Sequence, residues 1–259
     1  MTGGKGFCLF ISIYLVCIHP SAARSAGLYE DPAGLSCFLL SPREPSLASS
    51  MSYAEDEREK ASLYTLTANY PLKKRLFLQA EQPYITVSTG TEIVGGFGDF
   101  RLRLRCDLAA FPGFQAYFLG GLRSGSGTRL VYPYASGSID AEAGLAVVDT
   151  ISSWTWWGAL TGATVWRGPE EFDDQKAHTN YMALHLGLVL PVQPRLDLGF
   201  SGSGYVLQSG AARELYSVGL VYRPTAAVNL FGSVLAEGGK PEERVDDFSF
   251  VAGVRVFYD

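Results

Sequence analysis

Residues 99–107 carry a charged side chain at every second position, and the residues between them are all apolar. Successive side chains of a β-strand point to opposite faces, so this spacing predicts a strand with one charged face and one apolar face. Arginine suits such a face because its planar fork of N–H groups pairs with carboxylates. The charged set comprises Asp99, Arg101, Arg103, Arg105 and Asp107.

Two kinds of fold could use such a strand. In a soluble, secreted β-sandwich the charged face would meet water and the apolar face would meet a core. In a transmembrane barrel the apolar face would meet lipid and the charged face would line the lumen. The rest of the chain has to distinguish these two folds.

The composition favours a membrane. The chain has 259 residues, of which 47% are hydrophobic and 13% aromatic. This length suits one large barrel or two small domains. Amphipathic aromatic residues are typical of membrane interfaces. The formal net charge of -5 argues against nucleic acid as a partner.

The N-terminus has the pattern of an export signal. Lys5 precedes a short apolar run, 7–18, which is too short to span a bilayer as a helix. Small residues follow at 21–23, so we expect residues 1–23 to be a signal peptide cleaved after Ala23. The mature chain then keeps Cys37 and Cys106. Cys106 falls on the apolar face of its strand, which predicts a lipid-facing side chain rather than a disulfide or a metal ligand.

Residues 24–45 are expected to be an irregular periplasmic lead-in, because prolines at 32, 42 and 45 break any strand ladder. The apolar run 35–40 within it could pack inside the mouth of a barrel.

From residue 46 to residue 259 the sequence alternates between apolar and polar residues. Short proline-marked turns alternate with longer glycine-rich or charged loops between these segments. This asymmetry is typical of outer-membrane barrels, which have short periplasmic turns and an even number of strands. An even count of strands places both ends of the barrel domain in the periplasm. For this reason the weakly patterned segment 46–54 is counted as the first strand. About twelve strands are expected, at 46–54, 61–70, 75–87, 98–108, 114–123, 136–148, 154–166, 178–190, 195–207, 213–223, 226–236 and 247–258.

The predicted fold is therefore all-β: a single up-and-down transmembrane antiparallel barrel over residues 46–259. A soluble sandwich would need devices that protect its edge strands, and the repeats continue without them. Small residues on the inward face, at 187, 199, 201 and 203, suit a crowded lumen. Aromatic residues near strand ends fit interfacial girdles, namely Trp154, Trp156, Trp166, Tyr222 and Tyr258. The expected location is the outer membrane of a Gram-negative cell, in contact with lipid and lipopolysaccharide.

The segment Gly96-Phe97-Gly98-Asp99-Phe100 is followed by alternating basic and apolar residues. This segment resembles the signature of the outer-membrane transporter family named for the meta-pathway of phenol degradation. The hairpin rhythm from about residue 46 to the C-terminus is also similar to that family. The resemblance implies passage of small solutes, including hydrophobic or aromatic ones.

The last strand is similar to the signal that the barrel assembly machinery reads. That signal combines a glycine, an apolar residue three positions later and a terminal aromatic residue, here Gly253, Val256 and Tyr258. This chain departs from the pattern because it ends on Asp259.

If the barrel is correct, strand parity predicts the residues that line its interior. A set of arginines and acids there could favour small polar or anionic solutes in an open channel. The same residues could instead pair and plug the interior of a structural barrel that transports nothing. About twelve strands leave both hypotheses open, because eight strands fill themselves and sixteen enclose water. The inward charged set outside the opening strand comprises Asp140, Glu142, His185, Asp197 and Arg255.

A lipid-acting barrel enzyme is a third hypothesis. That chemistry needs a nucleophile within hydrogen-bond reach of a histidine, and the mature chain offers only His178 and His185. Because His185 is expected to face the lumen rather than lipid, and no Gly-x-Ser-x-Gly elbow is present, we expect no enzyme activity. No cofactor is expected.

Metal sites are not expected either. Acidic clusters in two expected outer loops are typical of solvated loops, although they could bridge divalent cations at a lipopolysaccharide surface. These clusters comprise Glu170, Glu171, Asp173 and Asp174, and Glu242, Glu243, Asp246 and Asp247.

Overall fold

The computed structural model describes residues 39–40, 44–55, 60–88, 91–128, 139–167, 180–207, 212–238 and 249–258. The expected signal peptide, most of the lead-in, the two acidic loop clusters, Cys37 and His178 lie outside these residues. No helix in the described ranges is long and apolar enough to cross a bilayer.

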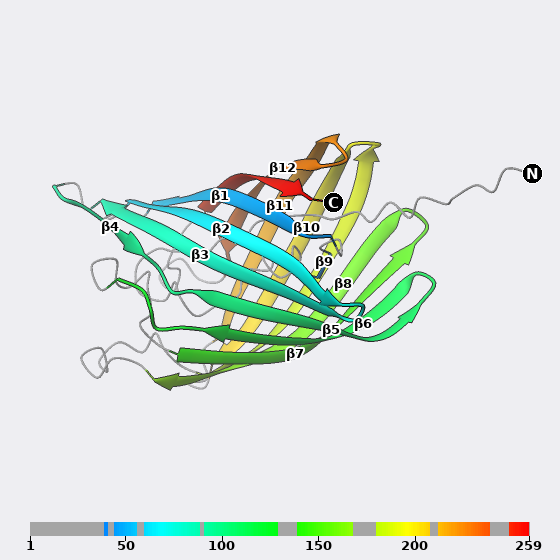
Figure 1. Cartoon of the computed structure of the whole chain (residues 1–259), viewed down its shortest axis with the longest axis horizontal. Coiled ribbons are helices and arrows are strands. Elements are labelled where there is room, and N and C mark those ends of the chain that lie inside the picture. The colour runs from blue at the N-terminus through cyan, green and yellow to red at the C-terminus, as the bar shows by residue number, and fades with distance from the viewer. Residues whose placement is uncertain are drawn as a thin grey trace, which may run out of the picture.

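The described strands form one antiparallel sheet that closes on itself, because β2 pairs with both β1 and β3 (Figure 1). Neighbours in the wall are mostly neighbours in sequence, and β1 pairs with β13 to complete the ring. The strands are β1 (Ser46–Glu55), β2 (Lys60–Lys73), β3 (Leu76–Ser88), β4 (Ile93–Phe97), β5 (Arg101–Phe111), β6 (Phe114–Arg123), β7 (Ile139–Ile151), β8 (Trp154–Arg167), β9 (Tyr181–Gln193), β10 (Leu196–Leu207), β11 (Ala212–Thr225), β12 (Val228–Glu237) and β13 (Ser249–Phe257).

Strands β4 and β5 occupy one position in the wall. Strand β3 pairs with β5 along its first half and with β4 along its second half. The closed wall therefore has twelve strands, which confirms the predicted fold. The sequence predicted no strand between 87 and 98, and this was wrong, because Ile93–Phe97 pairs with Tyr84–Ser88. Glycines at 95 and 96 suggested a loop, but the hydrogen-bond ladder to β3 holds them extended.

The break between β4 and β5 falls on the Gly98-Asp99-Phe100 motif. A Cβ atom at Gly98 would lie 2.8 Å from both Pro83 Cγ and Ile85 Cδ1, so glycine is needed for this close approach. The Gly98 carbonyl accepts from Gln82 Nε2 at 3.0 Å, and Asp99 Oδ1 accepts from Gly127 N at 2.9 Å. These bonds join the break to β3 and to the segment after β6.

All five turns at one end of the barrel contain two residues between paired strands, at 74–75, 112–113, 152–153, 194–195 and 226–227. Gly113 adopts a positive φ of 85° in one of them, a conformation that glycine adopts without strain. The first strand starts and the last strand finishes at the end of the barrel that carries the two-residue turns. There Tyr258 N donates a hydrogen bond to Pro45 O at 3.0 Å. This arrangement is the one that an even strand count requires.

The outer surface of the wall is apolar. Leucines and valines in the middle of the strands are about half exposed, including Leu66, Leu160, Leu184 and Val218. Exposed aromatic rings lie near the turn end of the strands, at Tyr70, Phe111, Trp154, Trp156, Tyr222 and Tyr258. An apolar band next to an aromatic girdle matches the lipid-facing surface of a membrane barrel.

The inner surface is filled by side chains. The Trp157 ring is 1% exposed and lies where a Cβ at Gly187 would be, with 2.3 Å between that Cβ and the indole Nε1. Phe231 covers Gly253 in the same manner. The small inward residue at position 187 therefore makes room for a large one on the neighbouring strand, as expected of a crowded interior.

This packing predicts different effects of the same substitution on two glycines. Gly187→Ala should lower the free energy of unfolding by about 1–3 kcal/mol, because the added methyl group overlaps the Trp157 ring. Gly204→Ala is the matched control, because its Cβ would meet nothing within 4 Å. Urea unfolding of the refolded protein in detergent, followed by tryptophan fluorescence, measures both. Equal effects of the two substitutions would contradict the packing described.

Candidate functional site

The charged residues predicted to face inward lie on the inner side of the wall. Glu142 is half-buried and the other nine are buried, with relative exposures of 9% or less. They do not form a single cluster. Asp99, Arg101, Asp140 and Glu142 lie toward the end opposite the two-residue turns, whereas Asp107, Asp197 and Arg255 lie nearer those turns.

Arg103 belongs to a hydrogen-bonded chain that crosses four strands. Its Nη1 donates to Gln79 Oε1 at 3.2 Å and lies 3.6 Å from Glu81 Oε1. Gln79 Nε2 then donates to Asn69 Oδ1 at 3.1 Å, and Asn69 Nδ2 donates to Ser46 Oγ at 3.0 Å. Buried polar groups need such partners, so this chain stabilises the part of the wall where β1, β2, β3 and β5 meet.

Arg105 binds the lead-in segment. Its Nη1 donates to the Leu39 carbonyl oxygen at 2.7 Å. The guanidinium carbon lies 4.6 Å from the centre of the Phe77 ring and 5.1 Å from that of Tyr117. Leu39 and Leu40 are 2% and 7% exposed. The expectation that the apolar part of the lead-in packs inside the barrel is thus confirmed for these two residues.

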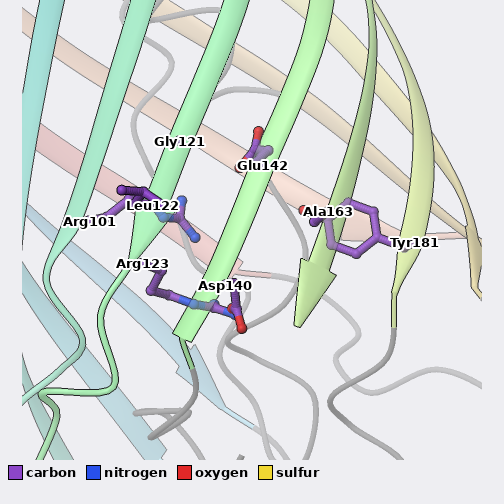
Figure 2. Close-up of a pocket in the computed structure, with 8 residues that line it drawn as sticks. All are labelled: Arg101, Gly121, Leu122, Arg123, Asp140, Glu142, Ala163 and Tyr181. Carbon is purple, nitrogen blue, oxygen red and sulfur yellow. The ribbon is translucent and has the colours of Figure 1, made fainter. Parts of the chain in front are cut away.

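A small cavity lies near the start of β5 (Figure 2). The Arg123 side chain reaches along the inner wall to Asp140 and forms an ion pair with it, and both are buried. Arg101 and Glu142 line the same cavity, as does the inward-pointing Tyr181 ring. Its volume is about 20 Å³, which is room for about one water molecule. Neighbouring strands therefore place two arginines beside two acids.

Arg123 was not among the residues singled out from the sequence. It is the last residue of β6, where an alternating pattern is weakest, and its pairing depends on the register Arg123↔Asp140. The available signal was the alternation within the expected strand 114–123, which places Arg123 on the face opposite the apolar residues Phe118 and Leu122. Gln79 and Glu81, the partners of Arg103, were likewise not singled out from the sequence.

His185 lies in a second polar chain, on the other side of the barrel. Its Nδ1 lies 2.6 Å from Ser203 Oγ and its Nε2 lies 2.9 Å from Thr161 Oγ1. The histidine is 0% exposed and its ring contacts the Tyr205 ring edge-on, with 5.6 Å between the centroids. Both ring nitrogens are engaged, so the histidine bridges β8, β9 and β10.

The remaining inward charges sit near the turns. Asp197 forms an ion pair with Arg223 across β10 and β11. Arg255 is 3% exposed, and its backbone pairs with Asn229 and Ala48. Within the described ranges, no group of three or more His, Cys, Asp or Glu residues could hold a metal ion.

The three residues of the expected assembly signal lie in or next to strand β13 of the wall. Gly253 lies under the Phe231 ring. Val256 pairs with Leu47 and Val228, and Tyr258 is 50% exposed near the turn end of the wall.

Comparison with known proteins identifies the fold. No protein-family model matches the sequence, and no curated protein matches it. Solved structures do match. The COG4313 outer membrane channel from Pseudomonas putida F1 has a TM-score of 0.66 at 12% identity, covering 84% of this chain and 96% of that one. The chain shares the fold of outer-membrane channels.

Two porins have the same architecture. The NanC porin has a TM-score of 0.59 at 10% identity, covering 82% of this chain and 100% of that one. The KdgM porin, solved in complex with disordered oligogalacturonate, has a TM-score of 0.58 at 9% identity, covering 83% of this chain and 99% of that one. The TM-scores establish a shared fold, whereas identities this low say nothing about the solute. The solute of this barrel must be argued from its own interior.

The buried ion pair at the cavity predicts a non-additive mutant series. Arg123→Gln should lower the free energy of unfolding by about 3–5 kcal/mol, because it leaves the Asp140 carboxylate buried without its arginine. Adding Asp140→Asn should restore at least half of that loss, since the double variant buries no charge at this pair. Urea unfolding in detergent measures all three proteins. Additive losses would contradict the coupling.

Proposed function

We propose that this chain is exported, loses residues 1–23, and folds in the outer membrane of a Gram-negative cell as a passive channel for small solutes. The observation that carries the proposal is the charged inner face of a closed barrel whose outer face is apolar. Supporting it, the solved structures that share the fold include an outer-membrane channel and two porins.

The charges on the inner face suit small polar or anionic solutes. Each cation on the described inner face is an arginine, and arginine keeps its charge at all physiological pH values. Arginines and acids on neighbouring strands create a field across the lumen that acts on a passing dipole or ion. The ten predicted inward residues are thus proposed to line the solute path.

The burial of the inner face supports a path that is closed at rest. The inward charged side chains are almost all buried, and Arg105 binds the backbone of Leu39. Residues 24–45 are proposed to be a periplasmic lead-in, and the burial of Leu39 and Leu40 against the inner face supports a role of this segment in closing the lumen. The low exposure of these charges equally favours the second candidate, a structural barrel with a plugged interior and no transport.

Three further proposals follow from the sequence. The C-terminal Gly253, Val256 and Tyr258 would be read by the barrel assembly machinery. The apolar belt would contact lipid and lipopolysaccharide. The resemblance to the meta-pathway transporter family extends the solutes to hydrophobic or aromatic ones.

Single-channel recording separates the two candidate functions. The refolded mature protein in a planar bilayer should give discrete but infrequent current steps, because the lumen is closed most of the time. Arg103→Ala should shift the reversal potential in a salt gradient toward cation selectivity, because it removes a positive charge from the path. Leu104→Ala, one residue along β5 on the lipid-facing side, is the matched control and should not shift it. A folded protein that remains silent would favour the structural barrel.

A further inference from the structure

The inner wall differs from one side of the barrel to the other. Strands β6 and β7 carry the paired charges of Arg123 and Asp140, and in the strand order of the ring they lie opposite β12 and β13. In the middle of β12, β13, β1 and β2 the wall instead presents buried hydroxyl groups. This hydroxyl patch comprises Ser233, Ser249, Ser50, Ser52 and Thr65, whose exposures range from 2% to 8%.

Two hydroxyls of the patch lack a hydrogen-bond partner. In the part of the chain that the structure describes, Ser233 Oγ and Ser249 Oγ are buried and no group bonds to them. The hydroxyl of Ser201, also on the inner wall, is by contrast engaged, with 2.6 Å between its oxygen and that of Ser217. Buried polar groups without a partner are rare in folded proteins. The hydroxyl patch can therefore bind a molecule that supplies the missing partners.

The strand register gives the patch an apolar centre. Ser233 pairs with Val251, and Ser249 lies two positions before Val251 on β13. The Phe231 ring lies over Gly253, in the next row toward the turns. Ser233 and Ser249 are thus diagonal neighbours on adjacent strands, which lie about 7–8 Å apart. A short carbon chain with a hydroxyl at each end spans that distance, and its C–H groups would contact Val251 and Phe231.

We propose that the hydroxyl patch binds small neutral polyols, with Ser233 and Ser249 hydrogen-bonded to hydroxyl groups of the solute. A hydroxyl group is both a donor and an acceptor, so each serine can complete a hydroxyl of the polyol and be completed by it. Because the patch carries no charge, an ion would lose its hydration there without gaining an opposite charge. This inference rests on the proposed channel function and names its solute class.

The stability of serine variants distinguishes a binding role from a structural one. Removing a hydroxyl that joins two strands should destabilise the barrel, whereas removing a buried hydroxyl that has no partner should not. Ser233→Ala/Ser249→Ala should therefore keep or raise the urea midpoint of unfolding in detergent. Ser201→Ala, which takes the partner from Ser217, should lower it. A lower midpoint for the double variant would refute the unpaired state of its two hydroxyls.

Saturation-transfer difference NMR with ribitol measures binding to the mature protein in detergent, after heat-dependent gel mobility has confirmed that each variant is folded. Ser233→Ala/Ser249→Ala should raise the Kd for ribitol by about tenfold, because each lost hydrogen bond weakens binding. Ser201→Ala is the matched control and should leave the Kd unchanged. Since the inner face is buried at rest, each measured Kd includes the fraction of time for which the path is open, and this fraction cancels in the comparison of variants.

Two results would refute the site. One is an equal Kd for the folded double variant and the unmodified protein. The other is the lack of any ribitol signal from the unmodified protein, which would mean that the patch holds water only.

Liposome swelling separates the site from the channel function. Ribitol should enter vesicles that contain the unmodified protein faster than vesicles that contain the double variant. Glycine betaine, a solute without net charge or hydroxyl groups, should enter both at the same rate. Ribitol binding that depends on the two serines, without swelling by either solute, would refute the channel function and leave the site. Ribitol swelling that the double substitution does not change would refute the site alone.

Discussion

The structure depends on the closure of a wall that is one strand thick. In a bilayer every backbone N–H and C=O group must find a partner within the protein, and a closed antiparallel ring provides one at every strand, including the β1–β13 pair. With only one layer, each residue faces either lipid or the interior. A charge in the middle of a strand must therefore be placed inside, and inside it must be paired.

This constraint explains the composition of the interior. Arginine can satisfy several acceptors at once, and the inner arginines contact carboxylates, amides and aromatic rings. Hydroxyl and imidazole groups join the strands on the other side, through Thr161, His185 and Ser203. Large apolar residues such as Trp157 fill the remaining space above glycines on the next strand. The inward side chains of the described strands are therefore closely packed against one another.

The alternation of apolar and polar residues is visible in the sequence, so the strand number, the barrel class and the side of the wall on which each of these charges lies were predictable. Contacts across strands were not, because they depend on register. The Arg123–Asp140 pair and the Arg103–Gln79 bond arise only when β5, β6 and β7 are aligned with their neighbours. Strand β4 was missed because Gly95 and Gly96 have no side chains from which to read a period. The position of Leu39 against Arg105 joins residues 66 apart in sequence, and no local pattern announces such a contact.

The central claim is that the alternating faces meet lipid on one side and a packed interior on the other. Spin labels on single cysteines, in a background where Cys37 and Cys106 are replaced by serine, test it in lipid vesicles. A label at outward-facing Leu184 should be relaxed strongly by oxygen and weakly by a water-soluble nickel chelate, whereas a label at inward-facing Ser217 should be immobile and protected from both. Strong relaxation of the Leu184 label by the nickel chelate would contradict a membrane barrel.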